Sequence, residues 1–395
     1  MIQMDAMIPL DAMPLVRARI DLTAIRHNVC QLKAKCRSQV TFMAVVKADG
    51  YGHGAVEVAR AALESGAQWL GVARLHEAVE LRHAGIMAPI LIFGYVPPEQ
   101  VPKLLALALS TTVYNLEMAT ALSEAAVSLG KPLNVHVKID TGMGRVGLIS
   151  NHALDETLQI AKLEGIRIEG VYTHFASADS RSEFDQAYTR QQIDRFEQVC
   201  ATLLQKGIDP GIRHAANSAG IIEYKRAHLD MVRAGISLYG LYPSGDIDPG
   251  SIALMPAMSL EATITSVREV PKGFKVSYGM TYETKKATRL ASVPAGYADG
   301  YSRLLSSKGE MLVHGKRAPI CGRVCMDQTL IDVGHIQGVK PGDTATLIGT
   351  QNGESVTADD LARLTRTINY EVVSSLTSRV GRVYSGRDDS GPDCA

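Results

Sequence analysis

A lysine stands where one candidate strand gives way to a glycine-rich turn. The segment AVVKADGYGHG (44–54) places Lys47 after three apolar residues and before a run of small residues around Tyr51. A lysine that is partly removed from water has a lowered pKa, and its neutral amine is a nucleophile towards an aldehyde. On position alone, a lysine that reaches from the strand end into solvent explains Lys47 better.

A second group of residues follows another candidate strand. The segment MVRAGISLYG (231–240) contains Arg233, with Gly235 and Ile236 just after it. In a (β/α)8 barrel, the loops after the last two strands commonly bind phosphate through backbone N–H groups. A lysine that forms a Schiff base and a phosphate site at one barrel mouth together suit pyridoxal phosphate. Arg233 would then face the pyridine nitrogen, although taken alone it is better explained by a structural ion pair.

The elements that position these residues alternate between short β-branched runs and amphipathic stretches, from residue 24 to about residue 240. Connections long enough for a helix imply parallel strands, and eight such units match a (β/α)8 barrel of the TIM type. An open doubly wound sheet usually has fewer strands and one dominant glycine-rich turn. The predicted strands are 41–46, 69–72, 89–94, 110–114, 133–139, 168–175, 211–214 and 231–240.

The pattern changes after residue 250, where period-two alternation separated by Pro/Gly turns predicts a mostly antiparallel β domain. One clear helix, 357–365, interrupts it. We therefore expect an α/β barrel domain over 14–250 and a β domain over 251–384. Residues 14–22 are expected to form a strand that packs with the β domain. The segments 1–13 and 385–395 are expected to be disordered tails.

Composition excludes several classes of function. The 395 residues include 41 basic and 41 acidic ones, so the net charge of zero points to neither nucleic acid nor an anionic membrane as a partner. No apolar run is long enough to span a bilayer, and no export signal is visible. The six cysteines are scattered and lack zinc-site spacing, so we expect no metal and a cytoplasmic location.

Nine motifs in order along nearly the whole chain resemble alanine racemase, a family of pyridoxal-phosphate enzymes of fold type III. That family combines a (β/α)8 barrel with a C-terminal β domain. The resembling segments are AVVKADGYGHG (44–54), KIDTGMGRVG (138–147), THFA (173–176), HAANSAG (214–220), MVRAGISLYG (231–240), VSYGMTY (276–282), GYADGY (296–301), GRVCMDQ (322–328) and TINYEV (367–372).

The resemblance implies a two-base racemisation of L-alanine and D-alanine. Lys47 matches the lysine that holds the cofactor as a Schiff base and then serves as the base on the D-alanine side. Tyr278 matches the base on the L-alanine side. Arg233 matches the arginine at the pyridine nitrogen, where a permanently charged donor keeps that nitrogen unprotonated.

The remaining site residues are also implied by resemblance alone. The residues matched to cofactor binding are Tyr51, Ser218, Gly235, Ile236 and Tyr370 at the phosphate and His174 beside the pyridine ring. Arg145 matches an arginine near the substrate carboxylate, and Lys138 matches a lysine that is often carbamylated. Met326 and Asp327 match a segment that reaches the partner subunit's pocket, and Tyr297 matches a tyrosine of the access corridor.

In the family, the second base and the Met–Asp segment act on the cofactor of the other subunit. The resemblance therefore implies a head-to-tail homodimer with shared active sites. It also implies a role in supplying D-alanine for peptidoglycan.

Several alternatives remain open at this stage. The run GMGRVG (142–147) satisfies G-x-G-x-x-G, the signature of a dinucleotide-binding oxidoreductase, but it follows a late strand and not the first. A pyridoxal-phosphate decarboxylase of basic amino acids, and a broad-specificity or serine racemase, would share the barrel. A cofactor-binding homeostasis protein would consist of the barrel alone, so the β domain argues against it.

Overall fold

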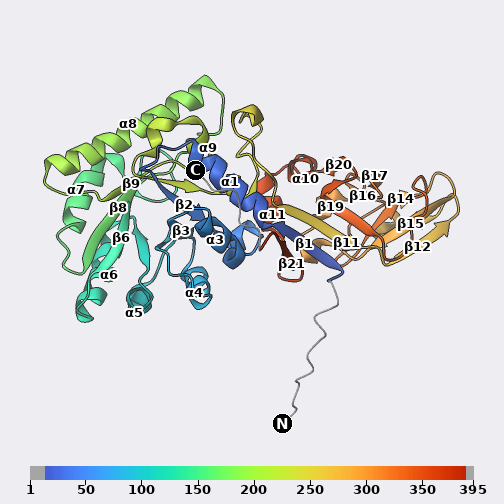
Figure 1. Ribbon diagram of the computed structural model, residues 1–395, viewed down its shortest axis with the longest axis horizontal. Helices are drawn as coiled ribbons and strands as arrows, with labels where there is room; N and C mark the ends of the chain where they lie inside the picture. The colour runs from blue at the N-terminus through green and yellow to red at the C-terminus, as the bar shows by residue number, and fades with distance from the viewer. Residues whose placement is uncertain (1–13, 388–395) are drawn as a thin grey trace, which may run out of the picture. The chain divides into compact units, whose positions relative to one another are not determined.

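The computed structural model describes residues 14–387, which form two compact units (Figure 1). The barrel unit begins at Leu22 and runs to Ala257, past the predicted boundary at residue 250. The β unit contains β1 (Val16–Asp21) and the segment from Met258 to Ser385.

Most of the two predicted tails, 1–13 and 385–395, lies outside the described residues. Ser385 is an exception, because it is the last residue of strand β21 (Gly381–Ser385).

Eight parallel strands close the barrel. They follow one another in the order β5-β4-β3-β2-β10-β9-β8-β6, and a further β5–β6 pairing joins the ends. The short β7 (Leu148–Ile149) pairs with β6 as an appendage. This confirms the predicted (β/α)8 fold. The barrel strands are β2 (Thr41–Val45), β3 (Trp69–Val72), β4 (Ile90–Ile92), β5 (Ser110–Val113), β6 (Leu133–Asp140), β8 (Ile166–Tyr172), β9 (Ile212–His214) and β10 (Met231–Ala234).

Helices connect successive strands and flank them in Figure 1. Their starts carry the expected capping side chains: Asn115 accepts a hydrogen bond from the N–H of Met118 (2.7 Å), and Ser182 accepts one from Asp185. The helices of this unit are α1 (Leu22–Ala34), α3 (Ala55–Glu64), α4 (Leu75–His83), α5 (Val101–Ala106), α6 (Leu116–Ser128), α7 (Ser150–Ile160), α8 (Glu183–Gln205) and α9 (Ser218–Glu223), with the short turn α2 (Lys47–Tyr51) after β2.

Several predicted barrel strands run past the ends of the observed strands, and the difference is largest in two of them. The run 231–240 is a strand only to Ala234, and Ile236–Tyr239 forms the 3₁₀ turn η3. The run 168–175 is a strand only to Tyr172. In both cases the loop after the strand is itself largely buried, so its residues are apolar too. The apolar run in the sequence therefore reflects burial and extends beyond the strand.

The β unit contains a seven-stranded sheet, a three-stranded sheet and a two-stranded pair. In the large sheet, β1 pairs antiparallel with β11 and parallel with β21. The strands of the large sheet are β17 (Lys316–Pro319), β16 (Glu310–Val313), β19 (Thr344–Gln351), β11 (Met258–Thr263), β1, β21 and β20 (Glu354–Val356). The smaller sheets contain β12 (Ser266–Val270), β15 (Thr288–Val293) and β18 (Thr329–Asp332), and β13 (Lys275–Val276) with β14 (Tyr282–Glu283).

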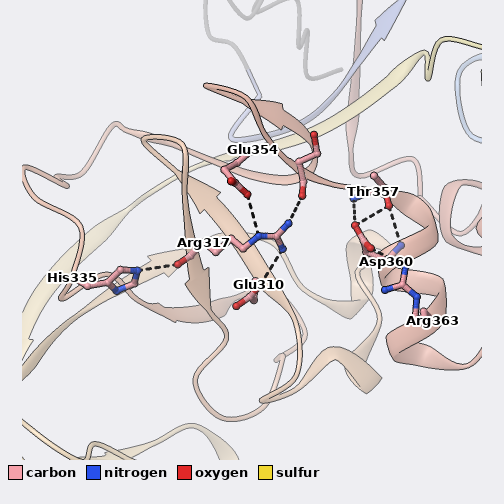
Figure 2. Close-up of polar contacts among 8 residues, drawn as sticks. Glu310, Arg317, His335, Glu354, Thr357, Asp360 and Arg363 are labelled. Carbon is pink, nitrogen blue, oxygen red and sulfur yellow. Dashed lines mark hydrogen bonds and ion pairs between the residues drawn. The ribbon is translucent and has the colours of Figure 1, made fainter.

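A surface network holds the strand ends of the β unit together. Figure 2 shows Arg317 of β17 donating hydrogen bonds to Glu310 of β16 (3.1 Å) and Glu354 of β20 (3.3 Å). Beside it, Thr357 and Asp360 form a reciprocal cap at the start of α10 (Ala358–Thr365). The second helix of the unit, α11 (Asn369–Ser374), was not predicted, because six residues are too few to show a helical period.

Within residues 14–387, no helix combines the length and apolar character required to cross a bilayer.

Candidate active site

Lys47 lies two residues past the end of β2 and begins a left-handed turn. Ala48, Asp49 and Tyr51 have φ values of 54°, 53° and 51°, a conformation that costs non-glycine residues about 1–2 kcal/mol each. Two hydrogen bonds hold the turn: Ala48 N–H donates to Oε1 of Glu77 (2.6 Å), and Asp49 Oδ1 accepts from the N–H of Ala55 (3.1 Å). Strain that is held in this way is typical of a functional turn.

The amine of Lys47 lies among other cations. Burial lowers its pKa, and the charges of Arg145 and Arg233 lower it further, while Glu77 opposes them. Its Nζ lies 5.8 Å from the ring centre of Tyr51. At a given pH, a larger fraction of Lys47 than of an exposed lysine is therefore in the neutral form, which acts as nucleophile and base.

Hydroxyl and N–H groups converge near Gly235. Ser218, the first residue of α9, accepts hydrogen bonds through Oγ from Gly235 N–H (2.9 Å) and Ser237 N–H (3.3 Å). A Cβ placed on Gly235 would lie 3.0 Å from the hydroxyl of Tyr51 and 3.7 Å from Oγ of Ser218. We call Tyr51, Ser218, Gly235 and Ile236 the hydroxyl cup. Its groups suit a phosphate bound by neutral donors.

Tyr239, which the sequence analysis did not single out, positions the cup. Its hydroxyl donates to the carbonyl of Val45 at the end of β2 (2.9 Å), and its ring lies 4.9 Å from that of Tyr51. Only its place in the segment MVRAGISLYG could have indicated this role from the sequence. An aromatic residue in an apolar, strand-like run otherwise looks like a residue of the hydrophobic core.

Arg233 is buried and held from several sides. Its Nη1 lies 2.9 Å from Nδ1 of His214, and its Nη2 donates to the carbonyl oxygens of Thr173 (2.8 Å) and Ala215 (2.9 Å). Nη2 also lies 3.3 Å from Nδ1 of His174. Burial lowers the pKa of Arg233 to about 10, which still leaves it charged at neutral pH.

His174 lies inside a cluster of cations. Burial lowers its pKa well below the ordinary value, and the charges of Arg233, Arg145, Lys138 and Lys47 act in the same direction. His174 is therefore neutral at physiological pH. The excess of positive charge around it favours an anionic ligand.

Arg145 lies in an exposed loop that β6 and α8 hold in place. Asp140 Oδ1 accepts hydrogen bonds from the N–H groups of Gly142 (2.9 Å) and Met143 (2.9 Å). From α8, Tyr188 donates to the carbonyl of Gly142 (2.8 Å). The G-x-G-x-x-G run is thus the turn after β6, the fifth barrel strand, not the first turn of a dinucleotide-binding sheet.

Lys138 is buried two residues before the end of β6. Burial lowers its pKa to about 8, with Arg145 and Arg233 contributing and Asp140 opposing. Its Nζ lies 6.0 Å from the ring centre of Tyr172. A substantial neutral fraction near pH 8 makes this amine reactive.

The site residues predicted beyond residue 251 belong to the β unit. Tyr278 begins the 3₁₀ turn η5 (Tyr278–Met280) between β13 and β14, so it is not the strand residue that the alternation suggested. Its side chain is 73% exposed. Three further side chains of the motifs in this unit are also exposed: Met280, Tyr297 and Met326. We call these four residues the loop patch.

Backbone contacts bring two of these loops together. Tyr297 N–H donates to the carbonyl of Cys325 (3.0 Å), and Ala298 N–H donates to that of Met326 (3.0 Å). A Cβ on Gly296 would lie 2.3 Å from both carbonyl oxygens, so only glycine permits the approach. The loop carrying Tyr297 and the loop carrying Met326 are therefore held against each other.

Asp327 and Tyr370 are placed elsewhere in the β unit. Asp327 accepts a hydrogen bond from Arg379 (2.6 Å), which also pairs with Asp299 (3.2 Å). Tyr370 is half-buried on α11. The structure thus gathers Lys47, the hydroxyl cup, Arg233, His174, Arg145 and Lys138 in the barrel unit, and leaves Tyr278, Tyr297, Met326, Asp327 and Tyr370 in the β unit.

Two families of known proteins match almost the whole of this chain. The family described as "Alanine racemase, N-terminal domain" matches residues 20–243, and "Alanine racemase, C-terminal domain" matches residues 257–384. The chain belongs to the alanine racemase family.

Relatives within the family are similar over nearly their full lengths. The alanine racemase of Desulforamulus reducens is 50% identical over 370 residues, covering 93% of this chain and 98% of the relative. That of Desulfosudis oleivorans is 49% identical over 382 residues, covering 94% and 97%. This chain is accordingly an isomerase of the racemase class.

Solved structures of the family share the fold. Alanine racemase from Clostridium difficile superposes with a TM-score of 0.90 at 39% identity, covering 96% of this chain and 97% of that one. The Bacillus anthracis enzyme, solved with bound L-Ala-P, gives a TM-score of 0.90 at 38% identity and the same coverage.

Proposed function

We propose that this racemase interconverts L-alanine and D-alanine with pyridoxal phosphate as cofactor and two residues, Lys47 and Tyr278, as the bases. The observation that carries the proposal is the convergence, in one barrel unit, of a pKa-lowered lysine, a hydroxyl cup and a buried arginine. Membership in the alanine racemase family supports the same chemistry.

The residues present fit the cofactor. The hydroxyl cup offers neutral donors to a phosphate, and the absence of a side chain at Gly235 keeps that space open. Among the described residues, every hydrogen bond of Arg233 uses Nη1 or Nη2, so Nε–H remains for a ring nitrogen. Tyr370, from the β unit, is proposed as a further phosphate ligand.

Lys47 would hold the cofactor and move a proton at Nζ. When bound, pyridoxal phosphate withdraws electrons from Cα of the amino acid and acidifies its proton. Because the pKa of Lys47 is lowered, its amine is free to accept that proton near neutral pH. Arg233, a charged donor that does not release its own proton, would keep the ring nitrogen unprotonated.

Tyr278 would move a proton at its hydroxyl on the opposite face. A tyrosine hydroxyl releases its proton more readily among positive charges, and the barrel mouth is rich in them. Because the Tyr278 side chain is largely exposed in the single chain, we propose that it acts on the cofactor of a partner subunit in a homodimer. Met326 and Asp327 would line that pocket, and Tyr297 its access corridor.

Arg145 and Lys138 would bind the substrate side of the site. Arg145 is proposed to hold the carboxylate of alanine, from a loop fixed by Asp140 and Tyr188. The pKa of about 8 makes Lys138 reactive towards carbon dioxide, and a carbamate there would present a negative charge to Arg145. We further propose that the D-alanine supplies peptidoglycan and that the reaction takes place in the cytoplasm.

Proton exchange with solvent tests the function directly. The purified protein is incubated with pyridoxal phosphate and L-alanine in D₂O, and NMR with chiral analysis follows the product. Deuterium at Cα together with D-alanine would support the proposal. Deuterium without inversion would remove Tyr278 from its role, and no exchange with alanine would refute alanine as the substrate. Serine and basic amino acids, tested in parallel, separate a broad-specificity racemase and a decarboxylase.

A further inference from the structure

A line of polar side chains crosses the interior of the barrel below Arg233. Nη1 of Arg233 lies 2.9 Å from Nδ1 of His214, and Nε2 of His214 lies 2.8 Å from Nδ1 of His136. Nε2 of His136 lies 3.4 Å from Oε2 of Glu169 and forms no hydrogen bond of ordinary geometry with the described residues, so this last contact is electrostatic. We call these four residues the barrel relay.

Aromatic rings fix the two imidazoles in place. Tyr172 stacks on His214 with 4.7 Å between ring centres and 8° between planes. Trp69 meets His136 edge-on at 5.5 Å. Both histidines are completely buried, and burial lowers the pKa of each, so both are neutral.

Glu169 ends the relay as an acceptor. Its Oε1 accepts from Nδ2 of Asn134 (3.1 Å), and its Oε2 accepts from the hydroxyl of Ser110. Burial alone would raise its pKa, but the contacts from His136 and Ser110 outweigh burial and hold the pKa below the ordinary value. A carboxylate whose neighbours are all donors is ionised at neutral pH.

The ionised carboxylate determines where each proton sits. Facing Oε2 of Glu169, Nε2 of neutral His136 must carry the hydrogen, because a lone pair there would be repelled. Nδ1 of His136 is then an acceptor, so His214 donates from Nε2. Nδ1 of His214 is consequently unprotonated and accepts from Arg233.

We propose that Glu169 is a positioning residue which, through His136 and His214, fixes the tautomer that holds Arg233. The relay also gives Arg233 a distant negative partner. Among the described residues, the hydrogen bonds of Arg233 go to carbonyl oxygens and histidine nitrogens and none goes to a carboxylate, and a buried charge without an opposite charge is costly. Without Glu169, His214 is free to carry its proton on Nδ1 and point it at the guanidinium.

The consequence for catalysis rests on the proposed function, whereas the tautomer does not. The substitution Glu169→Gln keeps the volume of the side chain but removes its charge and replaces one acceptor oxygen by an NH₂ group. The matched control is Glu164→Gln, which removes an equal charge from an exposed position just before the same strand, β8. Both variants are compared with wild type as pyridoxal-phosphate-loaded protein.

The first readout is the tautomer of each histidine, from long-range ¹H–¹⁵N correlations of protein labelled with ¹⁵N-histidine. Signals are assigned with His136→Gln and His214→Gln. We expect both histidines of wild type, and of Glu164→Gln, to be neutral and protonated at Nε2. We expect Glu169→Gln to lose this single tautomer. If wild-type His214 carries its proton on Nδ1, or if Glu169→Gln leaves both tautomers unchanged, the proposal is wrong.

The second readout is a kinetic split. Glu169→Gln should lower kcat for alanine by roughly tenfold, the order of effect expected when a buried acceptor loses its charge, with KM unchanged because the residue is remote from substrate. A rise in KM alone would contradict it. Wild-type protein that does not racemise alanine would refute the proposed function, while the tautomers would still decide this proposal. If Glu169→Gln did not fold, the tautomers of His136 and His214 in the wild-type protein would still decide the proposal, because they show which nitrogen of each ring carries the proton.

Discussion

The pKa of Lys47 is lowered first by burial and then by two neighbouring guanidinium groups, Arg145 and Arg233. The same cations act on His174 and on Lys138. Each of these residues taken singly has an ordinary structural explanation. Their shared environment distinguishes them, since strongly perturbed groups that influence one another cluster at functional sites.

Replacing Lys47 by alanine should abolish racemisation, because the residue is proposed both to hold the cofactor and to move a proton. We expect kcat/KM to fall by at least about 10³-fold, at the upper part of the range for a general base. The assay is formation of D-alanine from L-alanine. The control is Lys103→Ala on α5, an exposed lysine outside the site, which should retain full activity. Comparable activity in the two variants would contradict the role of Lys47.

Tyr278→Phe should separate the two faces of the reaction. If Lys47 serves D-alanine and Tyr278 serves L-alanine, the variant should still exchange the Cα proton of D-alanine with D₂O. Exchange from L-alanine should fall by roughly 10²-fold or more. Proton NMR of each enantiomer measures both rates. Equal losses for the two enantiomers would argue against the division of roles.

Lys138 predicts a specific dependence of stability on pH. Its pKa is about 8 in the folded protein and returns towards 10.5 on unfolding, so the unfolded chain binds more protons between these values. This residue's contribution to the free energy of unfolding is therefore lowest below pH 8 and rises up to about pH 10.5.

Lys138→Met, which keeps the length and removes the charge, should show a weaker rise in stability over that pH range than wild type. Urea unfolding at several pH values, in buffer free of carbon dioxide, measures the difference. Identical pH profiles would show that the amine is not perturbed.

At the scale of elements, turns and loops carry the site and the regular strands only place it. The repeated strand–helix pattern predicted the barrel because parallel strands buried on both faces are strongly apolar. The left-handed turn after Lys47 was not predicted, because Ala48 has no local preference for positive φ and the contacts that hold the turn, with Glu77 and Ala55, are not visible in the local sequence. Similarly, nothing near His136 in the sequence indicates its partner Glu169, since the two residues come together only through the register in which β6 pairs with β8.

Gly296→Ala should push two loops of the β unit apart. The added Cβ would lie 2.3 Å from the carbonyl oxygens of Cys325 and Met326. We expect a loss of about 1–3 kcal/mol, the usual cost of overpacking, and weaker dimerisation. Denaturant unfolding and sedimentation measure the two effects. Gly245→Ala is the matched control, because a Cβ there meets nothing within 4 Å; an equal effect in both variants would contradict the explanation.

At the scale of the whole molecule, the candidate residues are divided between two units, and the loop patch is rich in exposed aromatic and methionine side chains. Such composition is typical of the centre of a protein interface. An interface there would bring Tyr278 of one chain to the barrel of another, which the proposed homodimer requires.

Complementation between two inactive variants tests the shared site. Lys47→Ala and Tyr278→Phe chains, coexpressed with different tags, should form mixed dimers in which one of the two sites is intact. Random pairing then restores roughly a quarter of wild-type activity, because half the dimers are mixed and each has one working site. Separately purified homodimers serve as controls. No recovery in the purified mixed dimer would place both bases in a single chain.

The position of β1 has a consequence for how the chain is made. Val16–Asp21 leaves the ribosome before the barrel unit, yet its neighbours in the sheet, β11 and β21, begin at Met258 and Gly381. During synthesis the first strand must wait, unpaired, while the entire barrel is translated and becomes able to fold. The β unit is thus completed only when the last strand emerges, and a fragment beginning at Met258 would leave a gap between β11 and β21 with two unpaired strand edges, a template for aggregation.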